Sequence, residues 1–151
     1  NVDITLFVVD GSKQALGKGD NLILDKIKQA KAKTILVINK VDLVKKEDIF
    51  KLIDLYKDEY NFEAIIPISA EKQKNTEELL DEIEKHMPEG PMYYDIDEYT
   101  DQTGRQLVEE VIREKALKLL DEEIPHGIYI EVEKMNLRNT TKGQESYERG
   151  N

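Results

Sequence analysis

A cluster of polar side chains directly follows a short apolar run in this sequence. The run is TILVI, and the cluster supplies an amide at Asn39, an ammonium at Lys40 and a carboxylate at Asp42. A carboxylate accepts two adjacent N–H donors at once, and guanine offers such a pair at N1 and its exocyclic amine, whereas adenine does not. Asp42 could therefore select guanine, while the Asn39 amide reaches N7 and the stem of Lys40 covers the ring.

A second short motif, Ser69 and Ala70, follows another apolar run. The backbone N–H of Ala70 could donate to the guanine oxygen while Ser69 braces the loop, and small side chains keep the backbone close to the base. The letters NKVD alone also fit a plain loop before a helix, with Asp42 as a turn residue. Two such motifs, each at the end of a buried run, favour guanine recognition over that interpretation.

The elements that must position these motifs alternate between strand and helix. Three apolar runs rich in β-branched residues predict strands covered on both faces, at Ile4–Val9, Thr34–Asn39 and Ala64–Ser69. Helical spacing follows each of them, over residues 20–32, 46–60 and 75–87. This order predicts a parallel sheet in which the loops after the strands gather at one edge and bind ligands there.

The helical spacing also predicts which side chains face the core. In the first helix the predicted face consists of Leu22, Ile23, Ile27 and Ala30. In the second helix it consists of Ile49, Leu52, Ile53 and Tyr56.

The sequence changes character after the third helix. Residues 89–104 are rich in proline, glycine, tyrosine and acidic residues, which is typical of an interdomain linker. A helix is predicted from Gln106 to about Leu120, followed by a strand whose even-numbered residues face the core and whose odd-numbered residues, from Tyr129 on, face solvent. We therefore divide the chain into residues 1–88, the linker 89–104, and an incomplete second unit, 105–151.

Composition limits the classes of function. With 39% hydrophobic and 36% charged residues in 151, the chain is a globular protein of one or two domains. We expect no membrane span and no export signal, because the sequence has no run of eighteen apolar residues and no basic leader. Absence of cysteine and only two distant histidines argue against a metal site. Residues 1–88 carry 14 basic and 17 acidic residues and 89–151 carry 8 and 15, a balance that does not favour nucleic-acid binding.

The two motifs resemble those of the Ras-type, translation-factor-class GTPases. Residues 99–135, with REK followed by EIPH and an alternating strand, and the linker HMPEGPMYYD resemble the Era family of bacterial GTPases. The resemblance implies an α/β fold: the C-terminal half of a P-loop GTPase domain, with flanking helices on a parallel sheet, followed by the start of an α+β KH domain. The guanine-binding residues that it implies are Asn39, Lys40, Asp42, Ser69 and Ala70.

The sequence departs from the family pattern in two respects. After the Ser-Ala pair many relatives have lysine and then glycine, whereas this chain has Glu71 and, at the glycine position, Gln73. The phosphate-binding Gly-x4-Gly-Lys-Ser/Thr loop, the switch threonine, the Asp-x-x-Gly segment and the Gly-x-x-Gly loop of a KH domain are all missing. The run GSKQALGKGD is rejected because its glycines are one residue too far apart and Gly19 stands at the metal-binding position. The run DGSK after the first strand is interpreted as a turn. We expect an internal fragment with base specificity but no catalytic residue and no metal ligand.

For the whole protein the resemblance implies GTP or GDP as ligand, with Mg²⁺ held by parts outside this chain, and GTP hydrolysis. It also implies small-subunit ribosomal RNA and the small ribosomal subunit as partners, in a cytoplasmic protein that associates loosely with the inner membrane. Two alternatives stay open: another ribosome-assembly GTPase of the same superfamily, and a non-catalytic interaction domain. In the chain alone we expect the Ile4–Val9 strand to form an exposed apolar sheet edge and to promote self-association.

Overall fold

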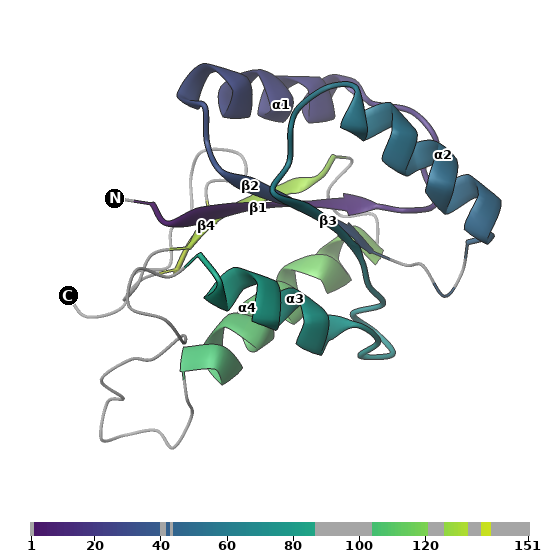
Figure 1. Ribbon diagram of the computed structural model, residues 1–151. Coiled ribbons are helices and arrows are strands. Elements are labelled where there is room, and N and C mark those ends of the chain that lie inside the picture. The colour runs from purple at the N-terminus through teal and green to yellow at the C-terminus, as the bar shows by residue number, and fades with distance from the viewer. Residues whose placement is uncertain are drawn as a thin grey trace.

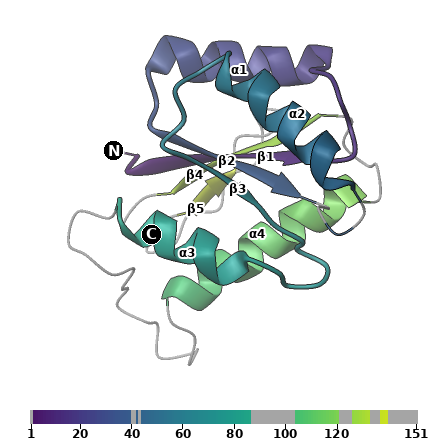
Figure 2. The same ribbon diagram turned by 45° about the vertical axis from the view of Figure 1, so that its right-hand side comes forward.

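The computed structural model describes residues 2–39, 42, 44–86, 104–120, 126–132 and 137–139. The strands are β1 (Ile4–Asp10), β2 (Thr34–Asn39), β3 (Ala64–Pro67), β4 (Ile128–Val132) and β5 (Leu137–Asn139). The helices are α1 (Lys18–Ala30), α2 (Lys46–Lys57), α3 (Thr76–Glu84) and α4 (Gly104–Leu120). All five strands form one sheet in the order β3-β2-β1-β4-β5. Helices α1 and α2 cover one face, and α3 and α4 cover the other (Figures 1 and 2).

The first three strands form the predicted parallel sheet. β1 pairs with β2 from Thr5↔Thr34 to Asp10↔Asn39, and β2 pairs with β3 in the same direction. Because the strands are parallel and in this register, the residues that follow them lie at one edge of the sheet. The predicted α/β fold with flanking helices is confirmed.

The core lies on both faces of the sheet, which explains the continuous apolar runs. Along β1, Ile4, Leu6 and Val8 pack into the layer with α3 and α4, and Phe7 and Val9 pack into the layer with α1 and α2. All seven residues of β1 and all six of β2 are buried. A strand buried on both faces has no solvated positions, so polar and apolar residues do not alternate in it.

The predicted buried face is confirmed for α2 and only in part for α1, where Ile27 is buried and Ile23 packs against the core. In α2, Ile49, Leu52 and Tyr56 are buried, and burial, followed by the charge of Asp20, raises the pKa of Tyr56. In α1 the buried residues are Asp20, Leu24 and Ile27, whereas Leu22 is 68% exposed and Ala30 is also exposed. Asp20 and Leu24 lie on the buried face in place of Leu22 and Ala30, and the Asp20 carboxylate accepts two backbone hydrogen bonds.

The predicted exposed edge at Ile4–Val9 is wrong, because a second strand covers it. β4 pairs antiparallel with β1 from Ile4↔Val132 to Val8↔Ile128, and β5 pairs with β4. This strand too is covered on both faces: Tyr129 is only 4% exposed, and the Nζ atom of Lys26 on α1 lies 5.1 Å from its ring centroid. The solvated face predicted for β4 is therefore wrong at Tyr129, and the premise for self-association through β1 is removed.

The predicted linker, residues 89–104, lies outside the described residues except for its last position. The described parts of the second unit, α4, β4 and β5, are joined to the same sheet as the first unit. The boundaries at 88/89 and 104/105 stay a prediction. Among the helices that the structure describes, none is both long and apolar enough to cross a membrane.

Candidate guanine-binding site

The structure brings the two predicted motifs into direct contact. The backbone N–H of Ala70 donates a hydrogen bond of 3.0 Å to Oδ1 of Asn39, across 31 residues of sequence. Both residues are buried, with exposed fractions of 3% for Asn39 and 1% for Ala70. Because the N–H can only donate, the side-chain amide of Asn39 must present its oxygen to Ala70 and its nitrogen to the other side.

The Ser69–Lys74 loop is closed by its own backbone. Ser69 and Lys74 exchange two backbone hydrogen bonds of 3.1 and 2.9 Å, and Oγ of Ser69 accepts a further one of 3.2 Å from the Lys72 N–H. Gln73, the position at which relatives have glycine, has φ 55°, in the left-handed region. Gln73 therefore adopts the conformation that glycine adopts most readily, at a cost in backbone strain.

We predict that Gln73→Gly stabilises the protein by about 1 kcal/mol, because it removes this strain. The measurement is the free energy of unfolding from urea denaturation. Asn75→Gly is the matched control: Asn75 also has a positive φ, of 65°, but its Nδ2 donates to Pro67 O at 3.0 Å, a bond that glycine would lose. A variant that is less stable than the parent would show that the Gln73 side chain outweighs the strain.

Asp42 holds an unpaired acceptor. Its Oδ2 atom is buried and has no hydrogen-bond partner among the residues that the structure describes. A buried carboxylate oxygen without a donor is costly, and such an atom in a native protein usually indicates a ligand, a water or an ion. Lys40, the residue expected to cover the ring, lies outside the described residues.

The donor side of the site is occupied by internal partners. The Ala70 N–H, expected to meet the guanine oxygen, donates to Asn39, and its contact with the base stays a prediction. The Nδ2 atom of Asn39, expected to meet N7, donates to the Ala116 carbonyl of α4 at 3.4 Å. The arrangement thus leaves the acceptor at Asp42 available and engages the Ala70 N–H and one of the two N–H groups of the Asn39 amide.

The turn after β1 supports the end of β2. Oδ1 of Asp10 accepts hydrogen bonds from the Ser12 N–H at 2.9 Å and the Ser12 hydroxyl at 2.7 Å, which confirms the predicted strand-end turn. The Gly11 N–H donates to Asn39 O at 2.8 Å, and a Cβ atom at Gly11 would lie 2.6 Å from that oxygen. Gly11 thus permits the close approach that holds the backbone of Asn39 in place.

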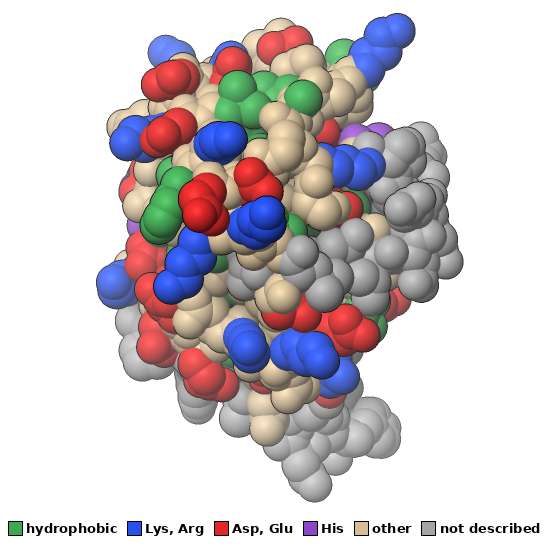
Figure 3. Space-filling model, turned by 90° about the vertical axis from the view of Figure 1, so that its right-hand side faces the viewer, with side chains coloured by type: hydrophobic (Ala, Val, Ile, Leu, Met, Phe, Trp, Pro, Cys, Tyr) green, Lys and Arg blue, Asp and Glu red, His purple; other side chains and the backbone are tan. Residues whose placement is uncertain are grey.

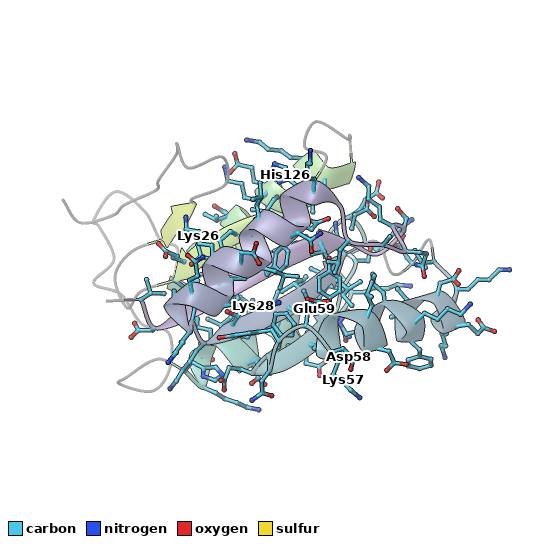
Figure 4. The ribbon with its side chains drawn as sticks, turned by 90° about the horizontal axis from the view of Figure 1, so that it is seen from above. Lys26, Lys28, Lys57, Asp58, Glu59 and His126 are labelled. Atoms are coloured by element: carbon cyan, nitrogen blue, oxygen red, sulfur yellow. The ribbon has the colours of Figure 1, made fainter. Side chains whose placement is uncertain are left out.

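Sequence reasoning missed a second buried cluster, at the start of α1. Oδ1 of Asp20 accepts a hydrogen bond of 2.7 Å from the Gly127 N–H, and Oδ2 accepts one of 3.2 Å from the Gly17 N–H. His126 lies beside the amino-terminal end of α1 (Figure 4), and a Cβ atom at Gly19 would lie 2.6 Å from it. The contact between Asp20 and Gly127 spans 107 residues, so no local spacing could have revealed it.

Comparisons with known proteins identify the class of protein to which this fold and its candidate guanine-binding edge belong. The model of the family "Elongation factor Tu GTP binding domain" matches residues 1–89, which is more than half of the chain. The chain belongs to this family of GTP-binding domains.

Within that class the chain is similar to GTPase Era. It is 47% identical to GTPase Era of Clostridioides difficile over 92% of this chain and 47% of that protein. It is 44% identical to GTPase Era of Caldanaerobacter subterraneus subsp. tengcongensis over 91% of this chain and 46% of that protein. A crystal structure of an Aquifex aeolicus Era variant bound to GDP·AlF4⁻ matches with a TM-score of 0.54 and 32% identity, over 91% of this chain and 49% of that one. The chain spans about half the length of the curated relatives that it matches.

Proposed function

We propose that this chain supplies the guanine-reading part of a GTP-binding protein of the Era type. Asp42 accepts the N1 and exocyclic amine donors of the base, Asn39 and Ala70 form its N7 and oxygen side, Ser69 braces the loop, and Lys40 covers the ring. One observation carries the proposal: three residues after Asn39, whose amide ties the two motifs together, Asp42 has a buried carboxylate oxygen with no partner among the described residues. A structural turn would have its carboxylate paired or solvated.

In this chain alone the affinity for GTP should be low. A few hydrogen bonds to the base contribute roughly 1 kcal/mol each, while association costs about 4–15 kcal/mol in lost freedom. Contacts to the phosphates and to Mg²⁺ would come from other parts of the full-length protein. We therefore propose that this chain contains no catalytic residue for GTP hydrolysis and that the full-length protein hydrolyses GTP.

The partners proposed for the full-length protein are small-subunit ribosomal RNA and the small ribosomal subunit, in ribosome assembly in the cytoplasm, with loose association at the inner membrane. The Era-type sequence supports this part, through the resemblance of residues 99–135 to the start of a KH domain. The charges of this chain give no further support for RNA binding. Acidic and basic side chains are interspersed over the described part of the face at the strands' carboxyl ends (Figure 3).

The test is binding of fluorescent GDP to this chain and to the full-length protein, with unlabelled GTP, ATP and XTP as competitors. We expect binding only by the full-length protein, with competition by GTP and not by ATP. If neither protein binds GDP, the motifs are structural and the chain is a non-catalytic interaction domain. GTP turnover by this chain at the rate of the full-length protein would contradict the assignment of catalysis to the other half.

A further inference from the structure

We infer that Gly11 is a positioning residue for base recognition, because it fixes both ends of the segment that carries Asp42. This segment, residues 39–45, joins β2 to α2 and is called the base-reading loop below. The inference rests on the proposed function, since it concerns how the same loop is placed. Two contacts of Gly11 carry it, one with Asn39 at the start of the loop and one with Ile49 just beyond its end.

At the start of the loop, Gly11 holds the main chain of Asn39. Asp10 and Asn39 are the last register partners of β1 and β2, and the Gly11 N–H donates to Asn39 O at 2.8 Å. A Cβ atom at Gly11 would lie 2.6 Å from that oxygen and 2.9 Å from Cγ2 of Ile38. The nearest atom belongs to the backbone and not to a flexible side chain. Any side chain at this position would therefore push the main chain of Asn39 away.

Beyond the end of the loop, Gly11 faces the first apolar residue of α2. The same Cβ position lies 3.4 Å from Cδ1 of Ile49, which is buried with an exposed fraction of 7%. The Ile49 N–H donates to Lys45 O at 3.1 Å, so the last residue of the loop is tied to the helix at this point. The small size of Gly11 thus sets how closely the strand and the helix approach where the loop connects them.

A shift of Asn39 would reach the groups that meet the base. Its main chain is held by Gly11 and its side chain by the Ala70 N–H, which donates to Oδ1 at 3.0 Å. Asp42 follows only three residues later. Because hydrogen bonds weaken steeply with distance and angle, a small displacement of this loop is enough to impair recognition of the base.

The backbone conformation at Gly11 does not itself require glycine. Its φ lies outside the left-handed region that favours glycine. The turn is held by Asp10, whose Oδ1 accepts hydrogen bonds from the N–H and the hydroxyl of Ser12. Gly11→Ala therefore keeps the turn and changes the contacts with the two ends of the base-reading loop.

The test measures the affinity of the full-length protein for GDP and for IDP, whose base lacks the exocyclic amine, by competition with a fluorescent nucleotide. In Gly11→Ala we expect the affinity for GDP to fall about tenfold and that for IDP to fall less, because a displaced Asp42 loses a contact that only GDP offers. Gly17→Ala is the matched control, since a Cβ atom there meets its nearest neighbour at 3.5 Å, and it should leave both affinities unchanged. An equal proportional loss for GDP and IDP would overturn the inference, because a merely destabilised protein loses both alike.

A second variant tests the same packing without adding an atom. Ile49→Val removes the Cδ1 atom that lies near Gly11, and Ile27→Val makes the same chemical change on α1, in the same apolar layer. We expect the preference for GDP over IDP to fall about threefold in Ile49→Val and to keep the parent value in Ile27→Val. Equal preferences in these two variants would overturn the inference, even where Gly11→Ala does not fold.

Failure of this inference is distinguishable from failure of the proposed function. If the parent protein binds GDP, IDP and ADP equally well, the guanine-reading function itself is wrong. If the parent prefers GDP and this preference survives both Gly11→Ala and Ile49→Val, only the positioning role of Gly11 is removed.

Discussion

Asp42→Asn in the full-length protein is expected to change base preference from guanine to xanthine. The asparagine amide offers one acceptor and one donor where the carboxylate offered two acceptors, so one guanine donor loses its partner. Xanthine has a carbonyl in place of the exocyclic amine and accepts from the new amide. We expect the affinity for GDP to fall about 100-fold, since a site built for a hydrogen bond strongly rejects a ligand that cannot make it.

The measurement is competition by GTP and XTP against a fluorescent nucleotide, in parent and variant. Asp54→Asn makes the same chemical change at an exposed position on α2 and should leave both affinities unchanged. An Asp42→Asn protein that keeps the parent's preference for GTP would show that Asp42 does not read the base. Its buried oxygen, which lacks a partner within the described part of the chain, would then need another explanation.

Asp20→Ala is expected to give the largest loss of stability, about 2–4 kcal/mol. Two backbone donors, the N–H groups of Gly127 and Gly17, would lose their carboxylate partner, and the first of these bonds is buried. Each buried donor left unpaired costs roughly 1–3 kcal/mol. Because Asp20 joins α1 to the start of β4, the loss should also increase hydrogen exchange in β4.

Urea denaturation gives the change in the free energy of unfolding for this variant. Asp25→Ala on the same helix is the matched control, since Asp25 is exposed and its loss should change stability by less than about 0.5 kcal/mol. Asp20→Asn keeps one acceptor and should lie between the two. Equal stability of Asp20→Ala and Asp25→Ala would show that the Gly127 bond contributes little in solution.

The sequence predicted the elements that depend on local patterns. The first three strands were evident from their continuous β-branched runs, and the α2 face from the spacing of Ile49, Leu52 and Tyr56. The α1 face was predicted only in part, because the spacing of apolar residues does not show that the Asp20 carboxylate accepts a buried hydrogen bond from the distant Gly127 N–H. The position of β4 could not be predicted, because strand pairing between distant segments leaves no periodicity in either segment.

In the candidate site, too, local patterns were predictable and contacts between distant segments were not. The types and spacing of Asn39, Asp42, Ser69 and Ala70 predicted which side chains would gather at one sheet edge, and the structure brings Asn39 and Ala70 into contact. Their internal partners could not be inferred, because the contact of Asn39 with Ala116 spans 77 residues. The residues near Gly127 in the sequence do not indicate that this position must be glycine. The atoms that a side chain there would meet belong to Phe7 and Val8.

The pairing of β1 with β4 has a consequence for how this chain refolds. The two strands join residues 4 and 132, so the loop closed by their contact includes nearly the whole chain, while β1 and β2 lie about thirty residues apart. Closing a long loop costs more entropy and is slower than forming contacts between near neighbours. In refolding from denaturant, the parallel β1–β2–β3 unit should therefore form first. Until β4 arrives, the free edge of β1 is open to strands of other molecules, so refolding yield should fall as protein concentration rises.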